Sequence, residues 1–271
     1  KAVAVCPTHD GPLQRFAVIE GGMANITANT APVIAAPTTA GTGSEVGRSA
    51  VIVFDNGIKA GVRCPQIVTL AICDPDLTLT LPPAITASTG MDALAHCIET
   101  YSSPAVNPPA DAVALDGMQR IFRHLERAVA DGADRQARWH MMMGSVQGAM
   151  CFQKGMGAVH ALSHPLGALG HHHGTLNAIL LPHVLAFNLQ ALGPKADRIA
   201  AQAGLASGQA LPQAMADLVR RIGIAPRLRD LGVARHQLEA MAAAAPQDNA
   251  HKTNPRPMRQ EDYLSVLLAA Y

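Results

Sequence analysis

Two groups of side chains in the second half of the sequence could bind a metal ion. Asp92 and His96 are four residues apart within a segment predicted to be helical, so a carboxylate and an imidazole project from one face. His160 and His164 have the same spacing, and six of the 12 histidines fall between His160 and His183. One carboxylate with two or three imidazoles is a ligand set suited to Fe(II), Zn or a neighbouring first-row ion.

Each group also has a purely structural interpretation. An Asp–His pair at this spacing is common in helices, and a lone histidine on an apolar helix is more often a satisfied core residue than a ligand. The run His171-His172-His173 adds three imidazoles in an otherwise apolar setting. Packing alone would hardly satisfy the ring nitrogens of so many histidines. The clusters therefore favour a metal centre, although spacing leaves open which imidazoles bind.

A second candidate site is the run Thr38-Thr39-Ala40-Gly41-Thr42-Gly43-Ser44-Glu45, which follows a short apolar segment. Its small residues would let backbone amides approach a ligand closely. The run is neither a Walker A motif, which requires Lys after Gly, nor a GxGxxG motif. An ordinary glycine turn explains it about equally well.

The elements that must position these residues change in character near residue 80. Before it, the apolar runs at 32–37, 50–54, 59–64 and 66–73 predict strands, and Asp55-Asn56-Gly57 predicts a hairpin turn. After it, Ala-rich segments punctuated by Pro and Gly predict helices over 84–101, 110–130, 134–149, 157–167, 183–191, 195–203, 209–222, 235–245 and 260–271. We therefore expect an α/β domain over residues 1–80 and an all-helical domain over residues 81–271.

Composition narrows the class of protein. Hydrophobic residues make up 49% of the 271 residues and charged residues 15%, which indicates a large buried core. A net charge of +1 gives no reason to expect a nucleic-acid partner, and no uninterrupted apolar run has the length of a membrane span. The five scattered cysteines favour reduced thiols in a cytoplasm. The chain opens with Lys1 in an apolar stretch, which suggests a fragment of a longer protein.

Three stretches, APTTAGTGSEV, GMDALAHCIETY and VHALSHPLGALGHHHGTLNAILLPHV, together resemble the iron-containing (group III) alcohol dehydrogenases. Their order and separation match that family, and Thr253-Asn254-Pro255-Arg256-Pro257 is similar to its C-terminal signature. The resemblance runs from Lys1 to Tyr271 but lacks the earlier half of the nucleotide-binding domain, with its GGGS pyrophosphate loop. It implies a partial Rossmann-like domain followed by a helical metal-binding domain, an architecture shared with dehydroquinate synthase.

The resemblance also implies roles for individual residues. The implied metal ligands are Asp92, His96, His160 and His173. His173 is chosen because Gly174 follows it, as in the family's His-Gly, and His171 or His172 stays possible. His164 matches the histidine that relays the alcohol proton. The implied cofactor contacts are Thr38, Thr39, Gly41 and Thr42, with Val51, Lys59 and Leu77 lining the same cleft.

The resulting hypothesis is a metal- and NAD(P)-dependent alcohol dehydrogenase or aldehyde reductase that transfers hydride between nicotinamide and a small alcohol or hydroxy acid. The divalent ion, Fe(II) or Zn, would hold the substrate oxygen and lower the pKa of the alcohol. The alternative is a truncated metal-binding helical domain without turnover. A third possibility is a dehydroquinate synthase or glycerol dehydrogenase relative, although the Asp92 and His96 motif fits the iron group better. We expect a cytoplasmic homodimer without nucleic-acid or membrane partners.

Lys154, just before the second histidine group, has two interpretations. It could bind a substrate carboxylate, which would suit a short hydroxy acid or semialdehyde. A solvated lysine at a helix start is the more common situation, because lysines are rarely buried.

Overall fold

The computed structural model describes residues 1–55, 59–64 and 68–271 of the chain. These residues form two compact units, one from Lys1–Pro37 and Ser44–Asp74 and the other from Thr38–Gly43 and Pro75–Tyr271. Asn56 and Gly57 of the predicted hairpin turn, and the start of the run at 66–73, lie outside the described residues.

The first unit is built from short elements. It contains the helix α1 (Ala2–Val5) and the strands β1 (Ile34–Ala35), β2 (Ser49–Val53), β3 (Lys59–Arg63) and β4 (Leu70–Ala71), with three 3-10 turns between Leu13 and Asn25. Strand β2 pairs antiparallel with β3, and β1 pairs parallel with β4. Strands β1 and β4 are shorter than their apolar runs, because a ladder extends only as far as the partner backbone does. Val5, Phe16, Val62 and Cys64 form the core of this unit.

The start of the chain is tied to the segment that leads into β2. Lys1 Nζ donates to the backbone oxygens of Ser44, Gly47 (2.9 Å) and Ser49 (3.2 Å). Three carbonyl acceptors on one ammonium hold this turn in a single conformation.

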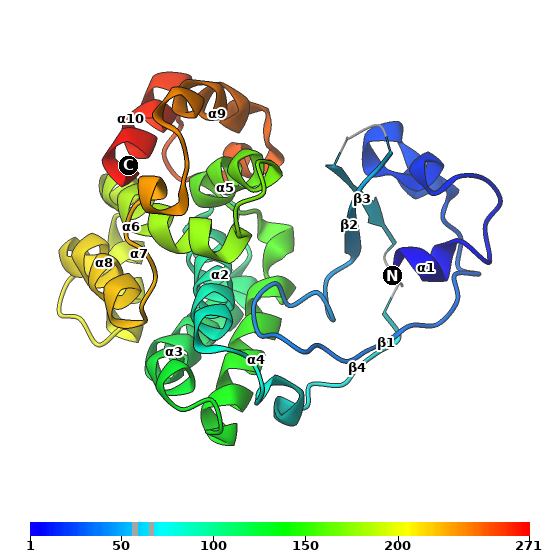
Figure 1. Ribbon diagram of the computed structural model, residues 1–271, viewed down its shortest axis with the longest axis horizontal. Helices are drawn as coiled ribbons and strands as arrows, with labels where there is room; N and C mark the ends of the chain where they lie inside the picture. Colours follow the sequence, from blue (N-terminus) through cyan, green and yellow to red (C-terminus); the bar gives the residue numbers. More distant parts are fainter. Residues whose placement is uncertain (56–58, 65–67) are drawn as a thin grey trace. The chain divides into compact units, whose positions relative to one another are not determined.

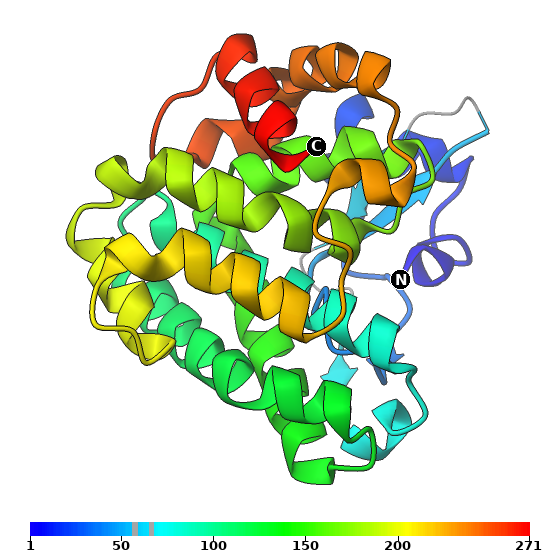
Figure 2. The same cartoon turned by 60° about the vertical axis from the view of Figure 1, so that its left-hand side comes forward.

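The second unit is helical (Figure 1). Its helices are α2 (Pro83–Ser102), α3 (Pro108–Ala130), α4 (Arg135–Met150), α5 (Ala158–Ala168), α6 (His173–Leu192), α7 (Pro194–Gln202), α8 (Leu211–Arg221), α9 (Leu238–Ala244) and α10 (Gln260–Ala270). Side-chain caps fix several starts: Asn107 accepts from the amide of Ala110, and Asp134 accepts from that of Ala137. The C-terminal helices α9 and α10 lie side by side (Figure 2).

Helix α2 is the centre of this unit. It packs against α3, α4 and α6, and its residues from Thr86 to Ser102 are almost all buried. Glycines allow the close approach: a Cβ on Gly90 would lie 2.4 Å from Leu125 Cδ1, and one on Gly144 would lie 2.6 Å from Ile121 Cγ1. A helix buried on every side shows no amphipathic face, so its neighbours are set by tertiary packing.

Helix α6 is longer than the sequence pattern predicts. The expected helix spans 183–191, after Pro182, because a proline inside a helix usually ends it. The observed helix begins at His173 and continues through Pro182, with buried leucines on both sides of the proline. Among the described residues, α6 is also the helix long and apolar enough to cross a membrane; 61% of its apolar window is buried in the unit, as in a core helix.

Candidate metal centre

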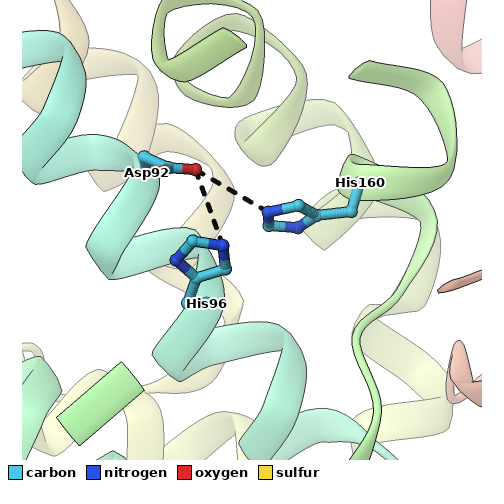
Figure 3. Close-up of side chains that lie close together, drawn as sticks. All are labelled: Asp92, His96 and His160. Atoms are coloured by element: carbon cyan, nitrogen blue, oxygen red, sulfur yellow. Dashed lines mark ion pairs between the residues drawn. The ribbon is translucent and has the colours of Figure 1, made fainter. Parts of the chain in front are cut away.

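Three buried side chains from two helices meet in the second unit. Asp92 and His96 lie one turn apart on α2, and His160 faces them from α5, with the side chains pointing toward one another (Figure 3). The Oδ1 of Asp92 is 3.7 Å from the Nε2 of His96 and 3.7 Å from that of His160. One ligand atom from each lies within 4.8 Å of the others, a spacing that allows them to share a metal ion.

The first residue of α6 adds a fourth side chain. His173 Nε2 lies 3.5 Å from Asp92 Oδ1, and the His173 side chain is about one-third exposed. Its neighbour His172 is the N-cap of α6 and accepts a weak hydrogen bond from the amide of Thr175. The structure thus brings His173 to the cluster and turns His172 toward its own helix.

Three of these four side chains direct a ligand atom at the same amide nitrogen. Asn177 Nδ2 lies 2.7 Å from Asp92 Oδ1, 3.3 Å from His160 Nε2 and 3.2 Å from His173 Nε2. Within the described part of the chain, Asn177 Oδ1 and His96 Nδ1 are buried without a hydrogen-bond partner. A buried carboxylate and imidazoles directed at one position suit a divalent cation, which would compensate their burial.

Glu99 orients one of these imidazoles. Its Oε2 lies 2.5 Å from His160 Nδ1, and its Oε1 accepts a hydrogen bond of 2.7 Å from the amide of Val159. With Nδ1 held by a carboxylate, Nε2 is the nitrogen that faces Asp92. Sequence reasoning missed both Glu99 and Asn177. The available signals were an acidic residue in an apolar helix and an asparagine one turn after His173.

Burial and mutual contact shift the protonation of these groups. Burial favours the neutral form of Asp92, but the neighbouring His96 and His160 hold the pKa of this carboxyl well below its usual range. Burial lowers the pKa of His96 to about 3, although the nearby Asp92 opposes this. For His160 burial acts in the same direction, but hydrogen bonds with Asp92 and Glu99 outweigh it and raise its pKa to about 9.

His164 lies beside the cluster, one turn after His160 on α5. Its ring stacks on that of His173 with the centroids 5.4 Å apart, and 34% of its side chain is exposed. Its Nδ1 lies 2.7 Å from Asp248 Oδ2. Burial disfavours the charged form of Asp248, but the hydrogen bond with His164 keeps the pKa of Asp248 below its usual value. His164 is therefore placed between the buried ligands and solvent.

The loop Thr38–Gly43 belongs to the same unit. Ser145 Oγ donates to the carbonyl of Gly41 (2.9 Å), and a Cβ on Gly41 would lie 2.9 Å from that of Thr89. Gly43 has a φ of 62°, which side chains rarely adopt, and a Cβ there would lie 2.4 Å from the carbonyl oxygen of Ser145. Both its backbone conformation and the lack of space therefore require glycine. The loop is thus held against α2 and α4, with Thr38, Thr39 and Thr42 exposed.

The other predicted cofactor contacts are spread over both units. Leu77 lies in the 3-10 turn Pro75–Thr78 of the second unit and is 42% exposed. Val51 is an exposed residue of β2 in the first unit, and the backbone of Lys59 opens β3, opposite Val53. The structure therefore brings together the four loop residues, and Leu77 lies on another element of their unit.

Lys154 fits neither interpretation offered by the sequence. Its side chain is fully buried, forms an ion pair with Asp111 and donates a hydrogen bond of 3.0 Å to the carbonyl of Tyr101. The carbonyls at the end of α2 have no partner inside the helix, and a buried ammonium satisfies one of them. Lys154 is a structural residue at the C-terminus of α2, neither solvated nor free to bind a substrate.

Comparisons with known proteins show which family the chain is similar to. The model of the Fe-containing alcohol dehydrogenase family, C-terminal, matches residues 86–271, and the model named iron-containing alcohol dehydrogenase matches residues 1–75. The chain is 49% identical to a 4-hydroxybutyrate dehydrogenase of Cupriavidus necator, over 98% of this chain and 73% of that protein.

Two solved structures share the fold. A 1,3-propanediol oxidoreductase has a TM-score of 0.94 and 36% identity, over 100% of this chain and 73% of that one. A sulfoacetaldehyde reductase from Bifidobacterium kashiwanohense, in complex with NAD+, has a TM-score of 0.91 and 30% identity over 99% and 72%. They confirm the predicted fold class, a partial nucleotide-binding domain followed by a helical domain. The oxidoreductase class indicated by the motifs is confirmed as well, and the chain belongs to the iron-containing alcohol dehydrogenase family.

Proposed function

We propose that this protein is a metal- and NAD(P)-dependent dehydrogenase that interconverts a small alcohol or hydroxy acid with its aldehyde. The observation that carries the proposal is the convergence of three imidazoles, from α2, α5 and α6, on the carboxylate of Asp92, with each Nε2 within 3.7 Å of its Oδ1. Membership of the iron-containing alcohol dehydrogenase family supports the reaction class.

Asp92, His96, His160 and His173 would hold the divalent ion. When bound, Fe(II) or Zn supplies a Lewis acid that favours deprotonation of an alcohol, and the nicotinamide supplies the hydride acceptor. Asp92 contributes the single negative charge of this ligand set, so it leaves one positive charge of a divalent ion uncompensated. Asp92, His96 and His160 are buried, so water is excluded around them. In this low-dielectric setting the remaining positive charge interacts more strongly with a substrate oxygen.

His164 would move the proton. Asp248 holds its Nδ1, which leaves Nε2 as the nitrogen that accepts the proton released by the alcohol. The partial exposure of the ring gives that proton a route to solvent. We expect Asp248→Asn to lower kcat more than it raises KM, because the amide no longer secures the required tautomer of His164.

The loop Thr38–Gly43 would contact the cofactor, with Thr38, Thr39, Gly41 and Thr42 as the contacting residues. Its exposed threonines and small residues allow close approach of a nicotinamide nucleotide, and Ser145 holds its backbone in place. The NAD+ complex of the related sulfoacetaldehyde reductase supports a nicotinamide cofactor.

The substrate would be a short hydroxy acid of the 4-hydroxybutyrate type. The relative that is 49% identical bears the name 4-hydroxybutyrate dehydrogenase, which supports this choice over a simple alcohol. A direct comparison of 4-hydroxybutyrate with 1,3-propanediol, at equal concentration and with NAD+ or NADP+, tests it. A higher kcat/KM for the diol would overturn the acid preference.

The decisive experiment measures bound metal and turnover together. Protein purified without oxygen is analysed by mass spectrometry for Fe and Zn, as wild type and as the variants Asp92→Ala and His160→Ala. His140→Ala serves as the control, because His140 lies on α4 and stacks on His124, away from this cluster. We expect about one equivalent of metal in wild type and control, lost in both ligand variants together with nicotinamide reduction. A folded wild type without metal, or metal without turnover, would refute the proposal.

A further inference from the structure

We infer that Glu99 and Asn254 are positioning residues of the metal centre, which act as a clamp on the first turn of α5. The inference rests on the metal-binding role proposed above and assigns a purpose to the C-terminal motif Thr253-Asn254-Pro255-Arg256-Pro257. Neither residue is among the proposed ligands. Both act through the helix that carries His160.

The first turn of α5 needs acceptors from elsewhere in the chain. Amides at a helix start have no partner within the helix, and the N-cap here is Gly157, which has no side chain to supply one. Asn254 Oδ1 accepts from the amide of Ala158 (3.2 Å), and Glu99 Oε1 accepts from that of Val159 (2.7 Å). Both acceptor side chains are buried, so water does not readily replace them.

The same carboxylate acts on the ligand itself. While Oε1 of Glu99 caps α5, its Oε2 holds His160 Nδ1 at 2.5 Å. A shift of the first turn of α5 would therefore move the buried ring of His160 away from Asp92. The position of α5 and the tautomer of His160 depend on one buried group.

Asn254 links this turn to a second ligand-bearing helix. Its amide and that of Asn188, on α6, exchange two hydrogen bonds of 2.9 Å each. Its Nδ2 also donates to the carbonyl of Arg256 (2.6 Å), so all parts of the amide are engaged. Next to it, Thr253 Oγ1 donates to the carbonyl of Met156 (2.7 Å), just before α5. The C-terminal motif thus ties α5, with His160, to α6, with His173.

Gly157 shows how little room the clamp leaves. A Cβ at this position would lie 2.8 Å from Glu99 Oε1 and 3.1 Å from Asn254 Oδ1. Its φ of −157° is accessible to any residue, so Gly157→Ala introduces a wedge between the acceptors without backbone strain.

The test measures affinity for Co(II) in the chelator-treated protein, by calorimetry and by the visible absorption of the bound ion. Glu99→Gln retains an acceptor for Val159 but presents an N–H to His160 Nδ1, which reverses the tautomer of the ring. Asn254→Ala removes one cap, and Gly157→Ala places a methyl group against both acceptor oxygens. Lys252→Ala is the control, because Lys252 lies on the same segment and its ammonium contacts the exposed Asn249 side chain.

We expect a loss of Co(II) affinity of about 10- to 100-fold for Glu99→Gln and Asn254→Ala, and an altered absorption spectrum for Glu99→Gln. Gly157→Ala should weaken Co(II) binding as well, and Lys252→Ala should bind as wild type does. Wild-type affinity and an unchanged spectrum in both Glu99→Gln and Asn254→Ala would overturn the inference. If Asn254→Ala fails to fold, Glu99→Gln and Gly157→Ala decide the question, and wild-type affinity in both would overturn the inference. Failure of the wild type itself to bind Co(II) would instead refute the proposed metal site.

Discussion

Gly174 is the position where the ligand-bearing start of α6 lies directly against α2. A Cβ at Gly174 would lie 2.3 Å from the carbonyl oxygen of Ser88 and 2.8 Å from its carbonyl carbon. Ordinary contact begins at 3.4 Å, so Gly174→Ala requires a movement of about 1 Å. Ser88 O belongs to the backbone of a buried helix, and no side-chain rotation can relieve the clash. The first turn of α6 must therefore move away, together with His173.

The size of the effect follows from two opposed terms. Overpacking against a rigid neighbour costs about 1–3 kcal/mol, whereas alanine in place of glycine stabilises a helix by up to about 1 kcal/mol. The net loss is about 1–2 kcal/mol, which corresponds to a decrease in Tm of roughly 2–8 °C for a protein of this size. A shift of about 1 Å also exceeds the tolerance of about 0.5 Å for a preorganised site, so metal affinity should fall at least about tenfold.

The assay combines thermal unfolding of the metal-free protein with a metal titration. Gly167→Ala is the matched control, because a Cβ at Gly167, on α5, meets no atom of the described residues within 4 Å. This control should be as stable as wild type or up to about 1 kcal/mol more stable, with unchanged metal affinity. A wild-type Tm and metal affinity in Gly174→Ala would refute the argument that α6 is positioned by backbone contact with α2.

Three further predictions concern single groups. His173→Ala should lose bound metal, whereas His172→Ala should retain it, as measured by mass spectrometry. His172→Ala should instead lose about 1 kcal/mol of stability in thermal melting, because it removes the N-cap of α6. The reverse pattern would assign the ligand to His172. Because the pKa of His160 is raised to about 9 in the metal-free protein, metal uptake below that pH displaces a proton. Apparent metal affinity should therefore fall by about tenfold per pH unit as the pH is lowered from 9 to 7, and a flat profile in calorimetry would contradict the cationic state of His160. Asp111→Asn should destabilise the protein by roughly 2–3 kcal/mol in denaturant unfolding, since it leaves the buried charge of Lys154 unpaired, and Lys154→Met in that background should restore most of the loss.

Local spacing predicted the parts of the site that one helix contains. The four-residue interval between Asp92 and His96 places both on one face of α2, and the same interval relates His160 to His164 on α5. Helix bounds in the second unit also follow the sequence closely, as for the predicted 110–130 and the observed α3 (Pro108–Ala130). These features depend on backbone periodicity and on Pro and Gly, which are readable within a few residues.

Other features were not predictable from local pattern. The start of α6 at His173 was missed because Pro182 is normally a stop signal, and packing on α2 overrides it. The burial of Lys154 was missed because its partners, Asp111 and the end of α2, lie more than 40 residues away in the chain. The roles of Glu99 and Asn177 were missed for the same reason, because their partners His160 and Asp92 are more than 60 residues away in the chain.

By itself the sequence determined the family, the order of an α/β part before a helical part, and the residue types available for a metal site. Only the tertiary structure decided that His173 rather than His172 approaches Asp92, and that Glu99 and Asn254 meet at the first turn of α5. The physical reason is that these choices depend on contacts between helices buried on several sides. Periodicity describes one helix face at a time. How the helices meet is fixed by close contacts between elements, of Gly174 with the backbone of Ser88 and of Gly157 with the side chains of Glu99 and Asn254.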